Sequence, residues 1–182
     1  MRVQTMVLAL LVLGWAGAAG AAERLTPSWM SVEVGAQTVA MDVVAGFNAN
    51  NSSWNFNAYY DGNATVVVPA GWGVRISLTN RDGDVPHSLV VIADPGSPDE
   101  LPLQAGREQV ALPRAYSKSP EHGISAGDQD VVAFKAKEAG DYLWFCGVPG
   151  HGQSGMWIYF EIAADADAPY LTVAEGAEPG RP

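Results

Sequence analysis

The sequence predicts an all-β fold in which two sheets of short strands pack face to face. Short runs rich in β-branched and aromatic residues recur along the chain, and segments rich in glycine, proline, asparagine and aspartate separate them. Helical periodicity is scarce, and short strands with such turn signals are typical of an antiparallel Greek-key β-sandwich. The expected strands are residues 32–34, 38–44, 64–68, 74–79, 88–92, 131–135, 141–145 and 156–162.

One long interruption separates the last three expected strands from the others. Residues 94–128 form the least strand-like part of the chain and contain five prolines: Pro95, Pro98, Pro102, Pro113 and Pro120. Because proline interrupts both helices and sheet ladders, we expect a long irregular insertion with one short helical turn. This insertion would precede the strand that leads to Cys146.

The chain is expected to form one domain, residues 23–163, between two terminal segments. Residues 1–22 carry one charge, Arg2, before an apolar stretch that ends in small residues. This pattern predicts a secretory signal peptide, with an uncleaved membrane anchor as the alternative, and a periplasmic or other extracytoplasmic location. Residues 164–182 are small, acidic and proline-bearing, which predicts a mobile tail.

The charge balance is strongly acidic. Ten Lys and Arg stand against 20 Asp and Glu, so the net charge is −10, and loss of Arg2 with the N-terminal segment makes it −11. Such a charge disfavours nucleic acid and anionic membrane surfaces as partners. It suits a basic docking surface on another protein, although solubility alone would explain it equally well.

Cys146 is the only cysteine of the chain. Exported domains of this size often use disulfides, but a single cysteine cannot form one internally. Cys146 is therefore a buried inert thiol, a reactive thiol or a metal ligand. Its neighbours favour the metal ligand.

Cys146 opens the pattern C-x4-H-x4-M, which continues with His151 and Met156. A thiolate, an imidazole and a thioether at short intervals, together with the distant His87, are the ligands of a mononuclear blue-copper site. The intervening glycines let the backbone curl around an ion between two strands. The sequence thus predicts that one loop presents three ligands and that His87 joins them from an adjacent strand.

Each of these residues also has an ordinary explanation. Cys146 could be a small buried hydrophobe, His87 and His151 could be loop residues, and Met156 could belong to the core. The four together are less easily accidental, because the chain has only three histidines and two stand where the site needs them. The third, His122, is expected on the surface.

Longer motifs resemble a known family. The ligand loop is similar to those of rusticyanin and sulfocyanin, both cupredoxins. The W-N-F-N-A-Y block at 54–59, V-P-A-G-W at 68–72, C-G-V-P-G-H at 146–151 and G-M-W at 155–157 resemble sulfocyanin closely. The resemblance covers roughly residues 44–162, although a long N-terminal membrane helix and a Ser/Thr-rich linker, present in archaeal sulfocyanins, are not evident.

The resemblance implies a cupredoxin sandwich with one type 1 copper, held by His87, Cys146, His151 and Met156. It implies a monomeric electron carrier whose partners are redox proteins such as a c-type cytochrome or a terminal oxidase, with a possible membrane tether. Ser88 is expected near the thiolate.

Two further expectations concern the surroundings of the site. We expect the edge of His151 near the surface, in an apolar patch that serves as electron port. The aromatic residues of the shared motifs are expected to pack the core and sheets rather than to form an electron path; they are Trp54, Phe56, Tyr59 and Trp72.

Two other functional classes are open to the same fold. Copper oxidases and nitrite reductases need additional histidines for further copper centres, and His122 is the one spare histidine. Copper storage or delivery would call for exposed Met- and His-rich tracts, whereas the chain has five methionines, two of them near the N-terminus.

Overall fold

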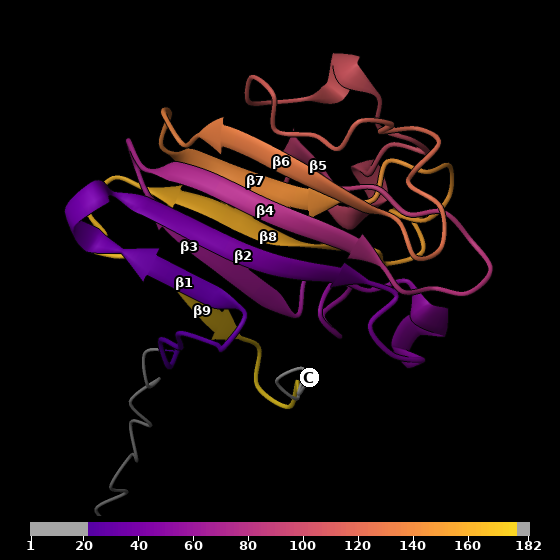
Figure 1. The fold of residues 1–182 in the computed structure, drawn as a ribbon, viewed down its shortest axis with the longest axis horizontal. Helices are drawn as coiled ribbons and strands as arrows, with labels where there is room; N and C mark the ends of the chain where they lie inside the picture. The colour runs from indigo at the N-terminus through magenta and orange to yellow at the C-terminus, as the bar shows by residue number, and fades with distance from the viewer. Residues whose placement is uncertain (1–21, 178–182) are drawn as a thin grey trace, which may run out of the picture.

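The computed structural model describes residues 22–177, which form two β-sheets packed face to face (Figure 1). In the view of Figure 1 the first sheet lies in front of the second. The first sheet has the order β1 (Met30–Glu33), β2 (Thr38–Ala45), β4 (Gly73–Asn80) and β6 (Gln129–Lys135). The second has the order β5 (Val90–Ala93), β7 (Gly140–Phe145), β8 (Trp157–Ala163), β3 (Ala64–Pro69) and β9 (Tyr170–Val173).

The strands follow the alternation of apolar and polar residues. In β2, Val39, Met41 and Val43 are buried and their neighbours Ala40 and Asp42 are exposed, because successive side chains point to opposite faces. The inward-facing side chains of both sheets form one core. This arrangement confirms the predicted all-β sandwich.

The sheets are mixed, and the prediction of purely antiparallel pairing is wrong. β2 pairs in parallel with β4, and β3 pairs in parallel with β8. Parallel pairs arise where the chain crosses between the sheets instead of turning back in a hairpin. The chain leaves β2, crosses to β3 in the other sheet and returns as β4 alongside β2. Such crossovers are typical of Greek-key sandwiches.

The C-terminal part is more ordered than expected. Residues 170–173, which we assigned to a mobile tail, form β9 and pair antiparallel with β3. Leu171 is fully buried and exchanges backbone hydrogen bonds with Leu25. The neighbouring residues are small and acidic, but the Leu171 side chain is buried in the core and holds the strand against β3. The domain therefore extends beyond residue 163.

The predicted N-terminal signal peptide or anchor, residues 1–22, lies almost entirely outside the described residues. Within residues 22–177, no helix has the length and hydrophobicity that crossing a bilayer would require.

The insertion between β5 and β6 is irregular, as predicted, and it packs along the edge of β5. It contains two short 3-10 helices, η3 (Pro98–Glu100) and η4 (Arg107–Gln109), rather than the one helical turn expected. Isolated bridges join it to the segment of β5, including His87 to Ile124 and Val90 to Tyr116. The insertion therefore covers the side of the sandwich on which His87 lies.

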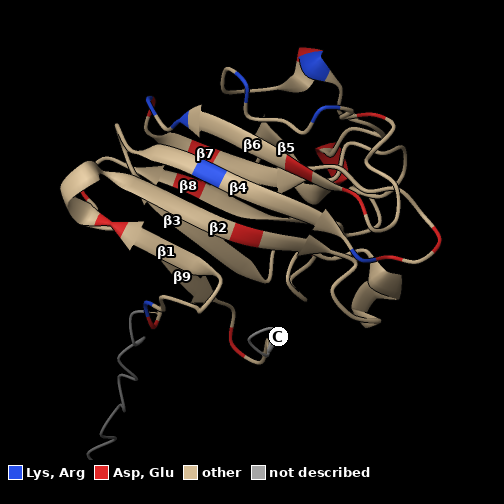
Figure 2. Ribbon diagram, in the orientation of Figure 1, with Lys and Arg blue, Asp and Glu red and all other residues tan. Residues whose placement is uncertain are grey.

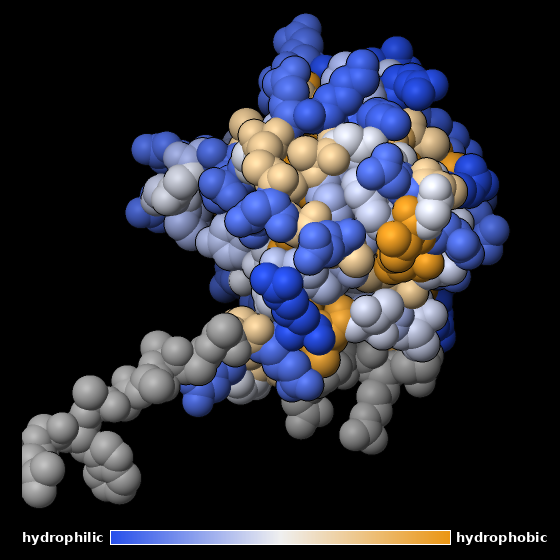
Figure 3. All heavy atoms as spheres, turned by 90° about the vertical axis from the view of Figure 1, so that its left-hand side faces the viewer, coloured by the Kyte–Doolittle hydropathy of each residue, from blue (hydrophilic) through white to orange (hydrophobic). Residues whose placement is uncertain are grey.

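The two remaining 3-10 helices lie in loops that join strands. η1 (Val34–Ala36) connects β1 to β2, and η2 (Asn50–Ser53) lies between β2 and β3. The end of the sandwich that contains η1 faces the viewer in Figure 3, where apolar side chains are scattered among hydrophilic ones. Val34, the first residue of η1, is 60% exposed. Isolated apolar residues of this kind are ordinary features of a surface.

Candidate metal centre

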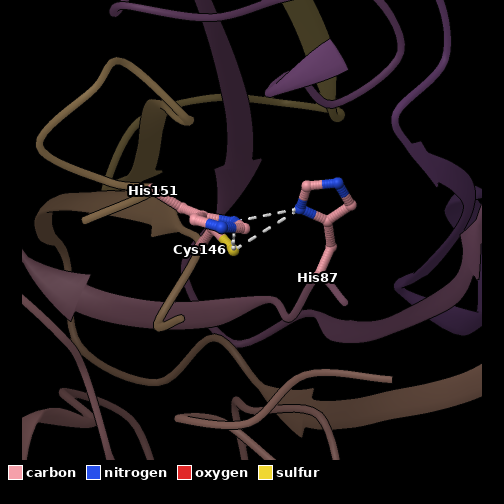
Figure 4. A group of neighbouring side chains, drawn as sticks. All are labelled: His87, Cys146 and His151. Atoms are coloured by element: carbon pink, nitrogen blue, oxygen red, sulfur yellow. Dashed lines mark hydrogen bonds between the residues drawn. The ribbon is translucent and has the colours of Figure 1, made fainter. Parts of the chain in front are cut away.

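Two loops at one end of the sandwich bring three of the predicted ligands together. Cys146 directly follows β7, His87 stands three residues before β5, and His151 lies in the loop between β7 and β8. Figure 4 shows the two imidazoles and the thiol directed at one another. His87 and Cys146 are fully buried, and His151 is 7% exposed.

The separations of the three donor atoms suit a single metal ion. The Nδ1 atoms of His87 and His151 lie 3.2 Å apart, and Cys146 Sγ lies 4.0 Å from the first and 3.6 Å from the second. A first-row metal ion bonded at about 2.0–2.3 Å to imidazole and thiolate would hold such donors roughly 3.5–4 Å apart in a trigonal plane. Two imidazoles and one thiolate are the donor set of type 1 copper, so the site fits one such ion.

The ligand loop is closed by its own backbone. The amide of Cys146 donates to the carbonyl of Met156, and the amide of Met156 donates to the carbonyl of His151, both at 3.0 Å. Close packing requires glycine at two positions. A Cβ on Gly147 would collide with the carbonyl oxygens of Ala105 and Pro120, and one on Gly152 would collide with the ring of Phe145. The glycines thus let the loop lie against the insertion and the core.

Met156 is fully buried in the core cluster that also contains Cys146. Its backbone hydrogen bonds join it to two of the three convergent residues. The role of its thioether as the fourth, axial ligand stays a prediction. His122 is exposed and lies outside the cluster of donors, as expected.

Asp82 is a functional residue that the sequence reasoning missed. Its Oδ2 lies 2.9 Å from His87 Nε2, so the imidazole donates to the carboxylate and presents Nδ1 to the other ligands. The Asp82 carboxylate also accepts the amides of Asp84 and Val85, while its own amide donates to Asn80 Oδ1. The turn after β4 thus fixes the tautomer and the orientation of His87.

The sulfur of Cys146 accepts hydrogen bonds from the backbone. The amide of Ser88 lies 3.4 Å from Sγ, and the amide of Val148 also donates to it. The expectation that Ser88 lies near the thiol is confirmed. Its hydroxyl, 3.9 Å from the sulfur, donates to the Pro120 carbonyl at 2.6 Å and accepts the Gly147 amide at 2.9 Å. The hydroxyl therefore joins the insertion to the ligand loop.

Burial sets the protonation of the three donors in the metal-free protein. Burial raises the pKa of Cys146 to about 11 despite the opposing amides of Ser88 and Val148. Burial and the neighbouring His87 lower the pKa of His151 to about 4, and burial lowers the pKa of His87 against the opposing effect of Asp82. At neutral pH both imidazoles are therefore neutral and able to bind a metal, whereas the thiol must release a proton.

Trp54 packs against the core, as expected, but its ring also contacts a ligand. Phe56, Tyr59 and Trp72 are buried, as expected for core residues. Trp54 is half-buried, and its ring stacks on His151 with centroids 4.4 Å apart and planes 17° apart. His151 is almost completely covered, so only a small part of the imidazole can form the edge expected near the surface.

The fold and the three donors define a blue copper protein. The model of the sulfocyanin (SoxE) domain matches residues 27–173, and the chain belongs to this family. It is 28% identical over 142 residues to the sulfocyanin of Sulfolobus acidocaldarius (strain ATCC 33909), a match that covers 75% of this chain and 69% of that protein.

Two solved blue copper proteins are similar to the chain at lower identity. Auracyanin A of Chloroflexus aurantiacus is 20% identical, with a TM-score of 0.48, over 69% of this chain and 99% of that one. Rusticyanin from Thiobacillus ferrooxidans is 19% identical, with a TM-score of 0.41, over 74% of this chain and 88% of that one.

Proposed function

We propose that this protein is an electron carrier that moves single electrons between respiratory redox partners outside the cytoplasm. The ligands of its copper ion would be His87, Cys146 and His151, with Met156 as a weak axial ligand. The observation that carries the proposal is the convergence of two imidazole Nδ1 atoms and one thiol sulfur within 4.0 Å of one another in a buried site.

The residues around the site suit reversible one-electron chemistry. Copper bound there supplies a couple between the +1 and +2 states, and two imidazoles with one thiolate in a plane are acceptable to both. The closed ligand loop and the bond from His87 to Asp82 keep the donors in place, so little rearrangement accompanies a change of oxidation state. Val148, which is buried in the same core cluster as Cys146, helps to exclude water from the site.

The partners would be redox proteins such as a c-type cytochrome or a terminal oxidase. The net charge of −10 supports a partner with a basic docking surface, and nucleic acid is disfavoured. Figure 2 shows acidic positions in the loop after β4, the loop that contains Asp82 and Asp84. The apolar N-terminal segment supports export to the periplasm, with a possible membrane tether, and the carrier would act as a monomer.

The sequence favours a carrier over a copper enzyme. Oxidases and nitrite reductases built from such domains use further copper centres, and their histidine ligands would have to come from elsewhere. Beyond His87 and His151 the chain has one histidine, His122, which is exposed. Storage or delivery is disfavoured by burial, because a buried site with several fixed donors releases its ion slowly.

Electron exchange with a basic c-type cytochrome tests the proposal. The copper-loaded protein should show one reversible one-electron wave in voltammetry and should oxidise the reduced cytochrome in stopped-flow mixing, with copper retained after many cycles. A protein that donates its copper to a chelating acceptor on the same timescale, without electron exchange, would be a delivery protein instead.

A further inference from the structure

We propose that Trp54 is the electron port of this protein, the side chain that a redox partner contacts when an electron is exchanged. The inference rests on the proposed electron-carrier function and adds the place of contact. One electron would pass from the partner's reduced cofactor through the stacked rings of Trp54 and His151 to the bound copper, which would change from +2 to +1. The indole itself would be neither oxidised nor reduced.

Burial of the ligands leads to this assignment. His87, Cys146 and Met156 are fully buried, and His151 is 7% exposed, so a partner has little direct access to any of them. Trp54 is partly exposed, and its indole stacks on the His151 ring with centroids 4.4 Å and planes 17° apart. Electronic coupling falls steeply across gaps, whereas stacked rings are in van der Waals contact. The indole therefore offers a continuous route from a ligand to solvent.

Trp54 is held in this position by a polar network. The Asn51 side chain donates to the carbonyl of Trp54 and to the carbonyl of Ser154 in the ligand loop, both at 2.9 Å. The Asp61 amide donates to the Gly155 carbonyl at 2.7 Å, which joins the two loops a second time. The stack is therefore attached directly to the loop that carries His151.

Asn55, the next residue, organises the loop from inside. Its side chain is fully buried, accepts the amides of Phe47 and Ala58, and donates to the carbonyls of Asn48 and Asn50. A buried amide with all these partners fixes a single loop conformation. The W-N-F-N pattern thus combines one partly exposed ring with a buried side chain that positions it.

The backbone before Trp54 is strained. Asn51, Ser52 and Ser53 have φ values of 49°, 55° and 66°, a left-handed conformation that is unfavourable for residues other than glycine. Three such residues in succession persist only where the surroundings compensate for them, and strain of this kind concentrates at functional sites. Here the hydrogen bonds of Asn51 and Asn55 offset the cost of the left-handed conformation. The backbone held in this way places the indole beside His151.

Exposed residues of the loops around the metal centre indicate the chemistry of the partner. Asp61 and Asp84, both exposed, lie in the two loops that carry hydrogen-bond partners of the site. Apolar side chains are exposed on the insertion and the ligand loop: Leu103 is 59% exposed, its carbonyl accepts the Gly150 amide, and Pro149 is exposed. We therefore expect a redox protein with a flat apolar centre at its cofactor edge and a basic rim.

Three variants of the copper-loaded full chain test the port: Trp54→Leu, Trp54→Phe and, as matched control, Trp29→Leu. Trp29, like Trp54, is half-buried and packs against the core, but within residues 22–177 its ring stacks on no histidine. Each is reduced by hexaammineruthenium(II) and by a basic c-type cytochrome, and the visible spectrum and reduction potential are recorded beside the rate constants. We expect Trp54→Leu to slow both reductions by about tenfold or more, within the range seen among variants of one interface. Its visible band and potential should stay near those of the wild type.

Trp54→Phe retains an aromatic ring and should recover most of the rate, and Trp29→Leu should react like the wild type. Wild-type rates in Trp54→Leu would overturn the port. Loss of the visible band in Trp54→Leu would also overturn it, because Trp54 would then hold the site together rather than conduct. If hexaammineruthenium(II) reduces the wild type but no cytochrome does, the proposed carrier function fails. The ruthenium rates of Trp54→Leu and the wild type still test whether Trp54 is the electron port.

Discussion

At the scale of single residues, two groups act on the site with opposite electrostatic effects. The Asp82 carboxylate, 2.9 Å from His87 Nε2, makes the imidazole a stronger donor and favours the +2 state of a bound copper. The Ser88 amide, 3.4 Å from Cys146 Sγ, withdraws charge from the sulfur and favours the +1 state. The reduction potential therefore depends on residues that do not bind the metal.

Asp82→Asn should raise the reduction potential of the copper-loaded protein. The substitution removes a negative charge that touches a ligand and that is ionised at neutral pH, since its pKa is lowered by the amides of Asp84 and Val85 and by His87, against burial. Asp84→Asn is the matched control, because it removes an exposed carboxylate from the same loop. Equal shifts in the two variants, measured by voltammetry, would show that the contact with His87 has no special role.

Substitution of Met156 tests the predicted axial ligand. Met156→Gln should retain copper and lower the potential, because an amide oxygen is a harder donor and stabilises the +2 state. Met156→Leu should retain copper and raise the potential. If either variant lost its copper completely, Met156 would be a structural residue or the site would be built differently.

The convergence of Cys146 and His151 was predictable from the spacing of ligand types in one loop, and His87 from the small number of histidines in the chain. Asp82 and Trp54 were not, because Asp82 reaches His87 through the conformation of the turn after β4, and Trp54 meets His151 from a distant part of the chain. One signal for Trp54 was present: a tryptophan beside two asparagines, Asn55 and Asn57, in a turn-rich segment. Asparagine side chains in such a loop can fix the backbone through hydrogen bonds and so position the tryptophan beside them.

At the scale of elements, the ligand loop depends on close contact with the insertion. Gly147→Ala would drive a Cβ into the carbonyl oxygens of Ala105 and Pro120. We expect the metal-free variant to lose about 1–3 kcal/mol of unfolding free energy, the usual cost of overpacking, and the loop to shift with a loss of copper affinity. Chemical denaturation and copper titration measure both effects.

Gly35→Ala is the control for Gly147→Ala, because a Cβ at Gly35 meets no atom within 4 Å. It should leave stability and copper affinity close to those of the wild type. If Gly147→Ala behaved like this control, the insertion would not support the loop in the way described.

Elements with strong alternation or flanking turns, such as β2 and β7, were predictable to within a residue or two. β9 was missed because its sequence is short and its neighbours are polar, and its pairing with β3 brings together residues about a hundred positions apart. The parallel pairs escaped prediction for a similar reason. Strand direction within a sheet depends on how the chain crosses between the sheets, not on the composition of a strand.

At the scale of the whole molecule, the net charge of −10 should act on encounter with a partner more than on the docked complex. Second-order rates with a basic cytochrome should fall as ionic strength rises, because salt screens charges beyond about 10 Å at 0.1 M. The transfer rate within the docked complex should change little. The salt dependence should vanish at strongly acidic pH, where carboxylates are protonated. Rates that do not respond to salt at neutral pH would rule out steering.

The proposed function depends on one type 1 copper held by His87, Cys146 and His151. The most direct measurement is the visible absorption of the metal-free protein during titration with copper(II), with Cys146→Ser as the control. We predict an intense blue or green thiolate-to-copper band that saturates at one copper per chain and is absent from a folded Cys146→Ser variant. A titration without such a band, or a band of the same intensity in Cys146→Ser, would contradict the claim.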